Sequence, residues 1–384
     1  MGPEPADSFP RPALPRSAAI LLTLACATVV AFGLAAMRGI VTPVFFAFVL
    51  TLCVHPLRRW MQGHGVPRGL ATGSTIGAVF ALLTGFGAVL FASLAQFSAL
   101  LPQYAPQLEQ LGASITELLE SLGFGPEQSQ AVVQGLTPGR IIGFIGGLLG
   151  NIASIVGGLV VILTMLILMA VDGSSVPALL THLNNHRPAL VTAFNGFGSG
   201  VRRYMIATTV LGVVQGLFNW LVLVLLQIPG ALLWGLLSFI CSFIPNIGYF
   251  IAIIPPLFFG FLTGGWPTVL AVIVVYGGIN GVIQSIIQPK YVGNAVALSE
   301  TLTFASVLFW AVILGPVGAI LAVPLTLLAR TILLDSDPTI AWWRPLTGDK
   351  KDLEILLKVE DDAIRARRAR RGSNNTDPGI PPKA

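Results

Sequence analysis

Long apolar runs separated by short polar segments occupy the chain from about Ser17 to Thr331. The most extreme run, from Ile141 to Val171, has thirty-one residues and no charged side chain. Because a helix rises 1.5 Å per residue, about 20 apolar residues are enough to cross the hydrocarbon layer of a membrane. The pattern therefore predicts an all-α integral membrane protein, in which polar groups at membrane depth are the first candidates for function.

Eight transmembrane helices follow from the lengths of these runs. They are expected at residues 17–37, 40–56, 69–95, 141–171, 204–227, 231–263, 267–288 and 303–331. The sixth run has thirty-three residues and is interrupted by Pro245, Asn246 and Gly248. Broken helix is tolerated at membrane depth only where protein or water covers the freed backbone groups. We therefore expect one broken crossing, or a crossing plus a re-entrant piece, next to a cavity.

The placement of lysine and arginine predicts that both termini are cytoplasmic. Loops rich in these residues remain on the cytoplasmic side of a membrane, and the basic loops fall on one side when the eight helices are counted from an inside N-terminus. The basic positions are Arg16, Arg58, Arg59, Arg68, Arg187, Arg202 and Arg203, followed by the arginine-rich tail. We expect a multi-pass membrane protein, with residues 96–140 outside.

Two tails flank the predicted transmembrane domain. Residues 1–16 are expected to form a disordered cytoplasmic tail, 17–334 the transmembrane domain, and 335–384 a basic, partly disordered cytoplasmic tail. Within the extracytoplasmic insertion, apolar residues recur at alternating spacings of four and three, which is typical of an amphipathic helix. They are Tyr104, Leu108, Leu111, Ile115, Leu118 and Leu122. Such a helix covers its own bundle, lies on the outer membrane surface or packs on another subunit.

Composition supports the membrane prediction and excludes several functions. Hydrophobic residues make up 54% of the chain and charged residues 10%, with a mean hydropathy of +0.81, whereas soluble domains have about 25% charged residues. The net charge of +5 lies mainly in loops and tails, so no nucleic-acid-binding face is expected. No P-loop, HExxH or nucleophile elbow occurs, and the three cysteines lack metal-binding spacing. We expect neither an enzyme nor a bound metal or cofactor.

Glycines recur along the run that covers residues 141–171. Small residues at intervals of four let helix backbones approach closely, which drives helix association in lipid. The positions expected to pack in this way are Gly139, Gly143, Gly147, Gly150 and Gly158. Gly212 and Gly216 repeat the spacing more weakly. Such faces are compatible with a homo-oligomer, without fixing its number of subunits.

The last third of the chain combines broken helix with polar side chains at membrane depth. Asn280, Gln284 and Gln288 recur every four residues on one face of an apolar segment, which predicts either a solute path or interhelical hydrogen bonding. Asn246 joins this predicted path, and Lys290 and Glu300 are expected to gate it if 281–302 folds back. The residues expected to break or hinge the helices are Pro245, Gly248, Pro255, Pro289, Gly293, Gly315, Pro316, Gly318 and Pro324, a pattern typical of transporter sites.

The same region resembles a known family. The stretches IPNIG, QPKYVGNAVALS and FWAVILGPVGAILAVPL are similar to the signature regions of the autoinducer-2 exporter (AI-2E) family of bacterial multi-pass transporters. The resemblance implies a location in the bacterial plasma (inner) membrane and export of a small diol or furanosyl-borate signal. Two positions depart from the family pattern: Glu300 stands where a proline is frequent, and Asn280 with Gly281 stands where glutamate and asparagine are frequent. This chain thus lacks the acidic side chain that would serve ion coupling.

Three functions remain open at this point. Export of a small polar or amphiphilic solute is favoured, because the interiors of the predicted helices contain no charged side chain. Monovalent cation/proton antiport, which the resemblance permits, predicts sodium exchange that depends on Glu300. A non-transporting scaffold predicts a stable oligomer that tolerates changes in the polar stripe. The lipid bilayer and a small solute are the expected partners.

Overall fold

The computed structural model describes residues 15–129, 137–150, 152–173, 175–288 and 298–336, together with the short pieces 347–348, 357–358 and 361. Within these ranges the regular structure is entirely helical. The helices are α1 (Arg16–Ala36), α2 (Arg38–Gly63), α3 (Arg68–Leu100), η1 (Leu101–Tyr104), α4 (Ala105–Ser121), α6 (Pro138–Gly150), α7 (Ile152–Asp172), α8 (Val176–His186), α9 (Pro188–Leu225), α10 (Ala231–Cys241), α11 (Gly248–Gly281), η2 (Val282–Ile287), α13 (Glu300–Leu314), α14 (Pro316–Ile320), α15 (Ala322–Arg330) and η4 (Thr331–Asp335). The all-α prediction is confirmed.

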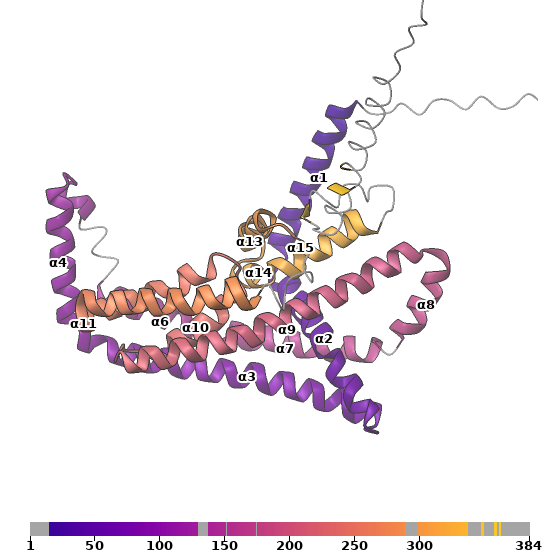
Figure 1. The fold of residues 1–384 in the computed structure, drawn as a ribbon, viewed down its shortest axis with the longest axis horizontal. Helices are drawn as coiled ribbons and strands as arrows, with labels where there is room; N and C mark the ends of the chain where they lie inside the picture. The colour runs from indigo at the N-terminus through magenta and orange to yellow at the C-terminus, as the bar shows by residue number, and fades with distance from the viewer. Residues whose placement is uncertain are drawn as a thin grey trace, which may run out of the picture.

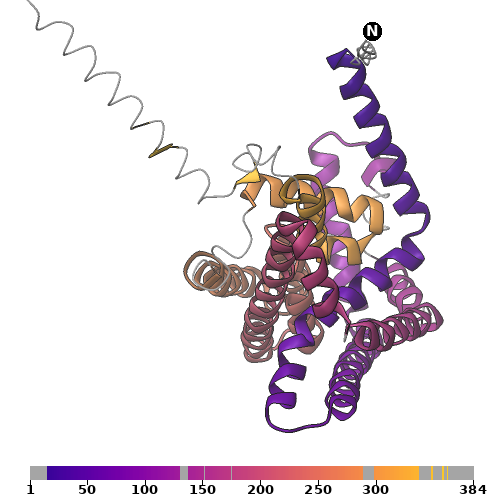
Figure 2. The same ribbon diagram turned by 90° about the vertical axis from the view of Figure 1, so that its right-hand side faces the viewer.

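The long helices lie side by side, and two others stand across them. In Figure 1, α3, α9 and α11 run along the long axis of the molecule, whereas α4 and α1 point away from it. Figure 2 shows α1 extending from the remaining helices towards the N-terminus. Its large apolar side chains are mostly exposed, Val29 and Phe32 by more than 70%, as expected for a helix surrounded by lipid.

Four helices of the described chain are long and apolar enough to cross a membrane, or five if α7 and α8 form one bent span. The multi-pass character is therefore confirmed, but the count of eight transmembrane helices is not. The helices also extend beyond the predicted runs: α9 begins at Pro188, whereas the apolar run begins at 204. The difference arises because a helix continues into the polar interface, where hydropathy no longer marks it.

Residues 231–263 form a helical hairpin rather than one straight helix. Helix α10 has 11 residues, about 16 Å, which is half the thickness of the hydrocarbon layer. The chain turns after Cys241 and returns as α11, so that the rings of Trp234 and Phe259 stack with centroids 5.8 Å apart. We call α10 and residues 248–264 the first hairpin.

Helix α11 doubles back at its middle. Gly265 has φ 63° and ψ −156°, which interrupts the helix. A side chain at Gly260 would meet Thr268 and Val272 at 3.3 and 3.7 Å, and one at Gly277 would lie 3.5 Å from the Tyr249 hydroxyl. The two halves of α11 are therefore antiparallel, and the turn coincides with the loop that the sequence predicts between its sixth and seventh helices.

A second hairpin follows near the C-terminal end of the described chain. Helix α13 ends at Gly315, whose φ of 76° reverses the chain into α14 and α15. The Trp310 indole Nε1 donates a hydrogen bond to Thr326 Oγ1 at 3.0 Å, which ties α13 to α15. We call α13, α14 and α15 the second hairpin.

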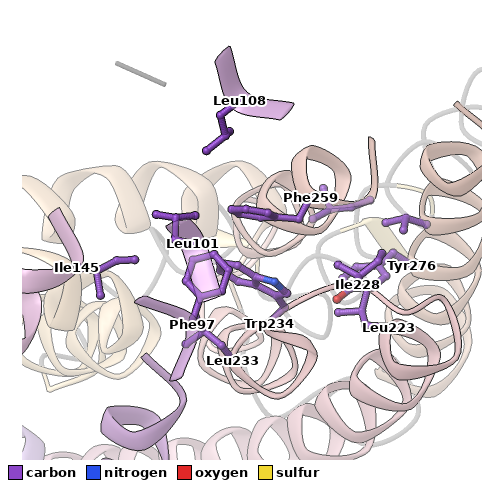
Figure 3. Packing of buried hydrophobic residues seen from close by; sticks show 12 residues of the cluster. Phe97, Leu101, Leu108, Ile145, Leu223, Ile228, Leu233, Trp234, Phe259 and Tyr276 are labelled. Carbon is purple, nitrogen blue, oxygen red and sulfur yellow. The ribbon is translucent and has the colours of Figure 1, made fainter. Parts of the chain in front are cut away.

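An aromatic core holds the first hairpin against α3. Phe97 of α3 meets Trp234 and Phe259 edge to face, with ring centroids 5.0 and 4.9 Å apart, a favoured aromatic geometry. The three rings lie together in Figure 3. Leu108 of α4 joins this core, whereas Leu118 is 59% exposed. The amphipathic helix is therefore present, and its inner end packs on the bundle; its extracytoplasmic location is still a prediction.

Candidate functional site

A small polar cavity lies where α9, the turn of the first hairpin, the second half of α11 and η2 meet. Its lining residues are Thr208, Leu211, Gln215, Cys241, Ser242, Gly248, Tyr249, Asn280, Ile283, Gln284 and Gln288. Water-sized molecules have a volume of about 20 Å³ available to their centres, and roughly 10–15 Å³ measured in this way holds one water. In this conformation the cavity has room for one or two waters and is too small for a larger solute.

The structure brings together the polar stripe that the sequence singles out. Asn280, Gln284 and Gln288 all line the cavity. Asn280 Oδ1 is buried and accepts no hydrogen bond from the described residues. A buried polar atom without a partner costs about 1–3 kcal/mol, so the atom favours a water or a polar solute in the cavity. Among the residues that the structure describes, those lining the cavity include no aspartate, glutamate, lysine, arginine or histidine.

Helix α9 supplies polar residues that the sequence analysis missed. Gln215 and Thr208 face Asn280 and Gln284 across the cavity. Gln215 is 6% exposed, and Asn219, one turn further along, is 1% exposed with its Oδ1 unpartnered within the described part of the chain. The spacing of seven and four between Thr208, Gln215 and Asn219 places all three on one helix face. That spacing is the signal that could have revealed this wall.

The turn of the first hairpin closes one side of the cavity. The Ile247 N–H donates to the Pro245 carbonyl at 2.7 Å, and Asn246 adopts a left-handed φ of 64°, so Pro245 and Asn246 make the reversal. Asn246 itself is exposed and does not line the cavity. A side chain at Gly248 would collide with the Cys241 carbonyl. Glycine is therefore required where α11 starts beside the end of α10.

Close backbone approaches fix the first hairpin against α9. A side chain at Gly212 would collide with the Ser242 hydroxyl, and one at Gly216 would lie 2.8 Å from the Gly235 carbonyl oxygen. A β-carbon at Gly216 would have to displace backbone, whereas one at Gly212 would displace the Ser242 side chain. The weaker glycine pair of the sequence analysis thus marks a close approach of α9 to the first hairpin, next to Gln215.

The turns of the two hairpins pack on each other. In the first hairpin, the turn residues Ile244 and Ile247 pack against a cluster in the second hairpin. This cluster is formed by Val307, Ala319 and Ala322. In the second hairpin, Gly315 makes the turn, Pro316 is the first residue of α14, and Pro324 is fully buried in α15. A side chain at Gly318 would collide with the Trp310 carbonyl. Pro255 lies within the helical first half of α11, away from the cavity lining.

The other predicted site residues lie apart from the cavity or outside the described chain. Glu300 is exposed as the first residue of α13, where the Ser299 side chain accepts a hydrogen bond from Leu302 N at 3.2 Å. A carboxylate at a helix N-terminus is favoured by the helix dipole. Pro289, Lys290 and Gly293 lie outside the described residues. Their proposed roles at the mouth of the path stay predictions.

The glycines expected to pack helices lie on open surface in this single chain. A side chain added at any of them would meet nothing within 4 Å; they are Gly139, Gly143, Gly147, Gly150 and Gly158. Packing against another subunit therefore stays a prediction. Within the described part of the chain, no three metal-ligating side chains gather.

Known proteins align with nearly the whole chain. The profile of the AI-2E family transporter matches residues 19–336. YhhT of Escherichia coli (strain K12), named as a transport protein, is 27% identical over 340 residues, covering 88% of this chain and 93% of the relative. The AI-2 transport protein TqsA of the same strain is 26% identical over 314 residues, covering 82% and 91%. A transport protein of Haemophilus influenzae is 28% identical over 342 residues, covering 87% and 97%. The chain therefore belongs to the AI-2E family of membrane transporters.

Proposed function

We propose that this protein exports a small, neutral, polar or amphiphilic solute of the autoinducer-2 kind through the cavity between α9, the first hairpin and α11. The observation that carries the proposal is the polar lining, uncharged in the part of the chain that the structure describes, in which Asn280 Oδ1 lacks a partner while Gln215 and Gln284 line the same cavity. Hydroxyl groups of a diol can satisfy amide groups of this kind, which donate and accept hydrogen bonds. The name of TqsA, which refers to AI-2, supports the same class of solute.

The broken helices suggest how the path opens. In transporters, discontinuous helices expose backbone groups at a site near the middle of the membrane, and one bundle moves against another around it. The cavity is too small for a solute as it stands, so transport requires the turns of the two hairpins to separate. The contact between Ile247 and the Ala319–Ala322 turn is the interface that has to part.

A topology with six crossings and two hairpins accommodates these observations. Helices α1, α2, α3, α7 and α9 and the second half of α11 cross, whereas the first hairpin enters from the outside and the second from the cytoplasm. This arrangement keeps both termini and all the basic loops on the cytoplasmic side, as the charge distribution requires. It replaces two of the eight predicted crossings with re-entrant hairpins.

Efflux from proteoliposomes tests the proposed function. Vesicles that contain the full-length protein are loaded with small diols, amphiphiles or sodium, and flux is measured with and without an imposed proton gradient. We expect diol efflux that ignores the gradient, and Gln284→Leu should lower it about 10-fold, because one hydrogen bond to the solute is lost. Gln96→Leu is the matched control, since Gln96 lies exposed on α3 outside the cavity.

Two other outcomes contradict export of a neutral solute. Sodium flux that needs the gradient and disappears in Glu300→Gln indicates cation/proton antiport. Absence of flux for every solute, from a protein that remains folded and membrane-inserted, indicates the scaffold function. Equal flux from Gln284→Leu and Gln96→Leu removes the polar stripe from the mechanism.

A further inference from the structure

An apolar groove lies between α2 and α7 and shares no lining residue with the solute cavity. It is lined by Ile40, Val41, Val44, Phe45, Phe48 and Met169, and has a volume of about 330 Å³. Five of the six residues belong to α2, and Met169 of α7 forms the opposite wall. Phe48 is held in place by stacking on Phe197 of α9, with ring centroids 6.1 Å apart. The volume and the apolar lining of the groove suit a hydrocarbon chain.

A cluster of cationic side chains lies towards the C-terminal end of the same helix. Arg58, Arg59 and Arg202 are close enough to the His55 ring for their charges to act on it. Arg58 donates through Nη1 to the Ala170 carbonyl at 3.3 Å, which caps the last turn of α7. Its Nε is buried without a hydrogen-bond partner in the described chain.

No carboxylate neutralises this cluster within the part of the chain that the structure describes. The ion pair found among the described residues joins Arg330 and Asp335, which are not part of the cluster. Asp172, two residues beyond Ala170, forms no ion pair with Arg58. Arg58 and Arg202 are half-buried, and neighbouring cations of this kind, one with an unpaired buried donor, are costly unless an anion joins them.

The groove and the cluster follow one another along α2. On α2, positions 41, 44, 45 and 48 lie on one face that continues through 52, 55 and 59, and Phe48 and His55 are about 10 Å apart along the axis. Met169 forms one wall of the groove, and its Sδ lies 3.9 Å from the Thr51 hydroxyl. The carbonyl of the next residue, Ala170, accepts the hydrogen bond from Arg58. An amphiphile in the groove therefore brings its polar end to the arginines.

We propose that an anionic phospholipid binds here, with an acyl chain in the groove and its phosphodiester on Arg58, Arg59 and Arg202. Arginine forks match phosphate oxygens in bidentate hydrogen bonds, and basic pockets between transmembrane helices bind lipid head groups. A lipid is chosen over a soluble anion because the cluster alone would suit either, whereas the apolar groove further along the same helix suits only hydrocarbon. The bound lipid would join α2, α7 and α9 at the side of the membrane that the charge distribution makes cytoplasmic.

Native mass spectrometry of the full-length protein in detergent tests the site. Dioleoyl phosphatidylglycerol, dioleoyl phosphatidylcholine and glycerol 3-phosphate are added separately, and the bound fraction is measured for each. We expect phosphatidylglycerol to bind at least 10-fold more tightly than the other two. Arg202→Gln should weaken its binding about 10-fold, because a charge-assisted hydrogen bond is lost. Val44→Trp should weaken it by filling the groove while leaving every charge in place.

Arg203→Gln is the matched control, because Arg203 neighbours Arg202 on α9 but is exposed and does not act on His55. Elution volume and melting temperature verify that each variant is folded, and Arg58 is left intact because it caps α7. Equal binding of the two phospholipids overturns the proposal, as does an equal loss in Arg202→Gln and Arg203→Gln. Glycerol 3-phosphate binding as tightly as the lipid indicates a soluble-anion site, and unchanged binding in Val44→Trp removes the acyl chain from the groove.

Discussion

Individual amide side chains differ in role although they lie on one face of one helix. Gln215 lines the cavity, whereas Asn219 is fully enclosed one turn away. Neither side chain makes a hydrogen bond with described residues that would be lost on replacement by leucine. An amide of this kind lowers stability where it is buried, so Gln215 is best explained by a hydrogen bond to solute or water.

Gln215→Leu should therefore separate function from stability. Diol flux is expected to fall about 5–10-fold through loss of one hydrogen bond to the solute, while the melting temperature stays equal or rises. Asn219→Leu, on the same face but outside the cavity lining, should leave flux unchanged. Flux assays and thermal unfolding of both purified variants give the comparison, and a lower melting temperature for Gln215→Leu with normal flux would falsify a role in the path.

At the level of elements, each hairpin depends on a glycine at a backbone contact. Gly248→Ala and Gly318→Ala each place a methyl group against a carbonyl, of Cys241 and Trp310 respectively. Overpacking of this kind costs about 1–3 kcal/mol, so both variants should unfold at lower temperature and transport less. Gly278→Ala is the control, since nothing lies within 4 Å of the added methyl and alanine favours a helix interior by about 0.5–1 kcal/mol.

If Gly248→Ala and Gly278→Ala unfold at the same temperature, the tight approach of α10 and α11 does not contribute to stability. Reduced flux with unchanged stability in Gly318→Ala would instead indicate that this glycine serves the movement of the second hairpin.

The elements were predictable from sequence to different degrees. Proline and glycine at 245–248 and 315–318 mark both hairpin turns, because these residues interrupt helices wherever they occur. Whether the chain continues across or turns back after Cys241 is set by the packing of Trp234 on Phe259 and Phe97. Such contacts join residues far apart in sequence, and periodicity does not reveal them. The face of α9 with Thr208, Gln215 and Asn219 is visible in the spacing, but its role as a wall is not, because only the tertiary structure places Gln215 and Asn280 in the same cavity.

For the whole molecule, the two topologies differ in where two loops lie. Eight crossings place residues 264–266 inside and 289–302 outside. With six crossings and two hairpins, 264–266 lies outside beside the α9–α10 turn, and the start of α13 lies inside. A β-carbon added at Gly260 would lie 3.3 Å from the Ile228 side chain. This contact places the turn at Gly265 at the same end of the molecule as the end of α9.

Cysteine labelling in intact cells therefore decides between the topologies. After Cys26, Cys53 and Cys241 are replaced by alanine, Trp266→Cys and Glu300→Cys are treated with a membrane-impermeant maleimide. We expect Trp266→Cys, whose native side chain is 69% exposed, to be labelled from outside, and Glu300→Cys to be labelled only after the cells are opened. Asn184→Cys on α8 is the inside control, because it lies among the basic loops. Labelling of Glu300→Cys from outside, with Trp266→Cys labelled only in opened cells, would restore eight crossings. Residues 231–263 would then span the membrane, and their turn would not lie beside the cavity.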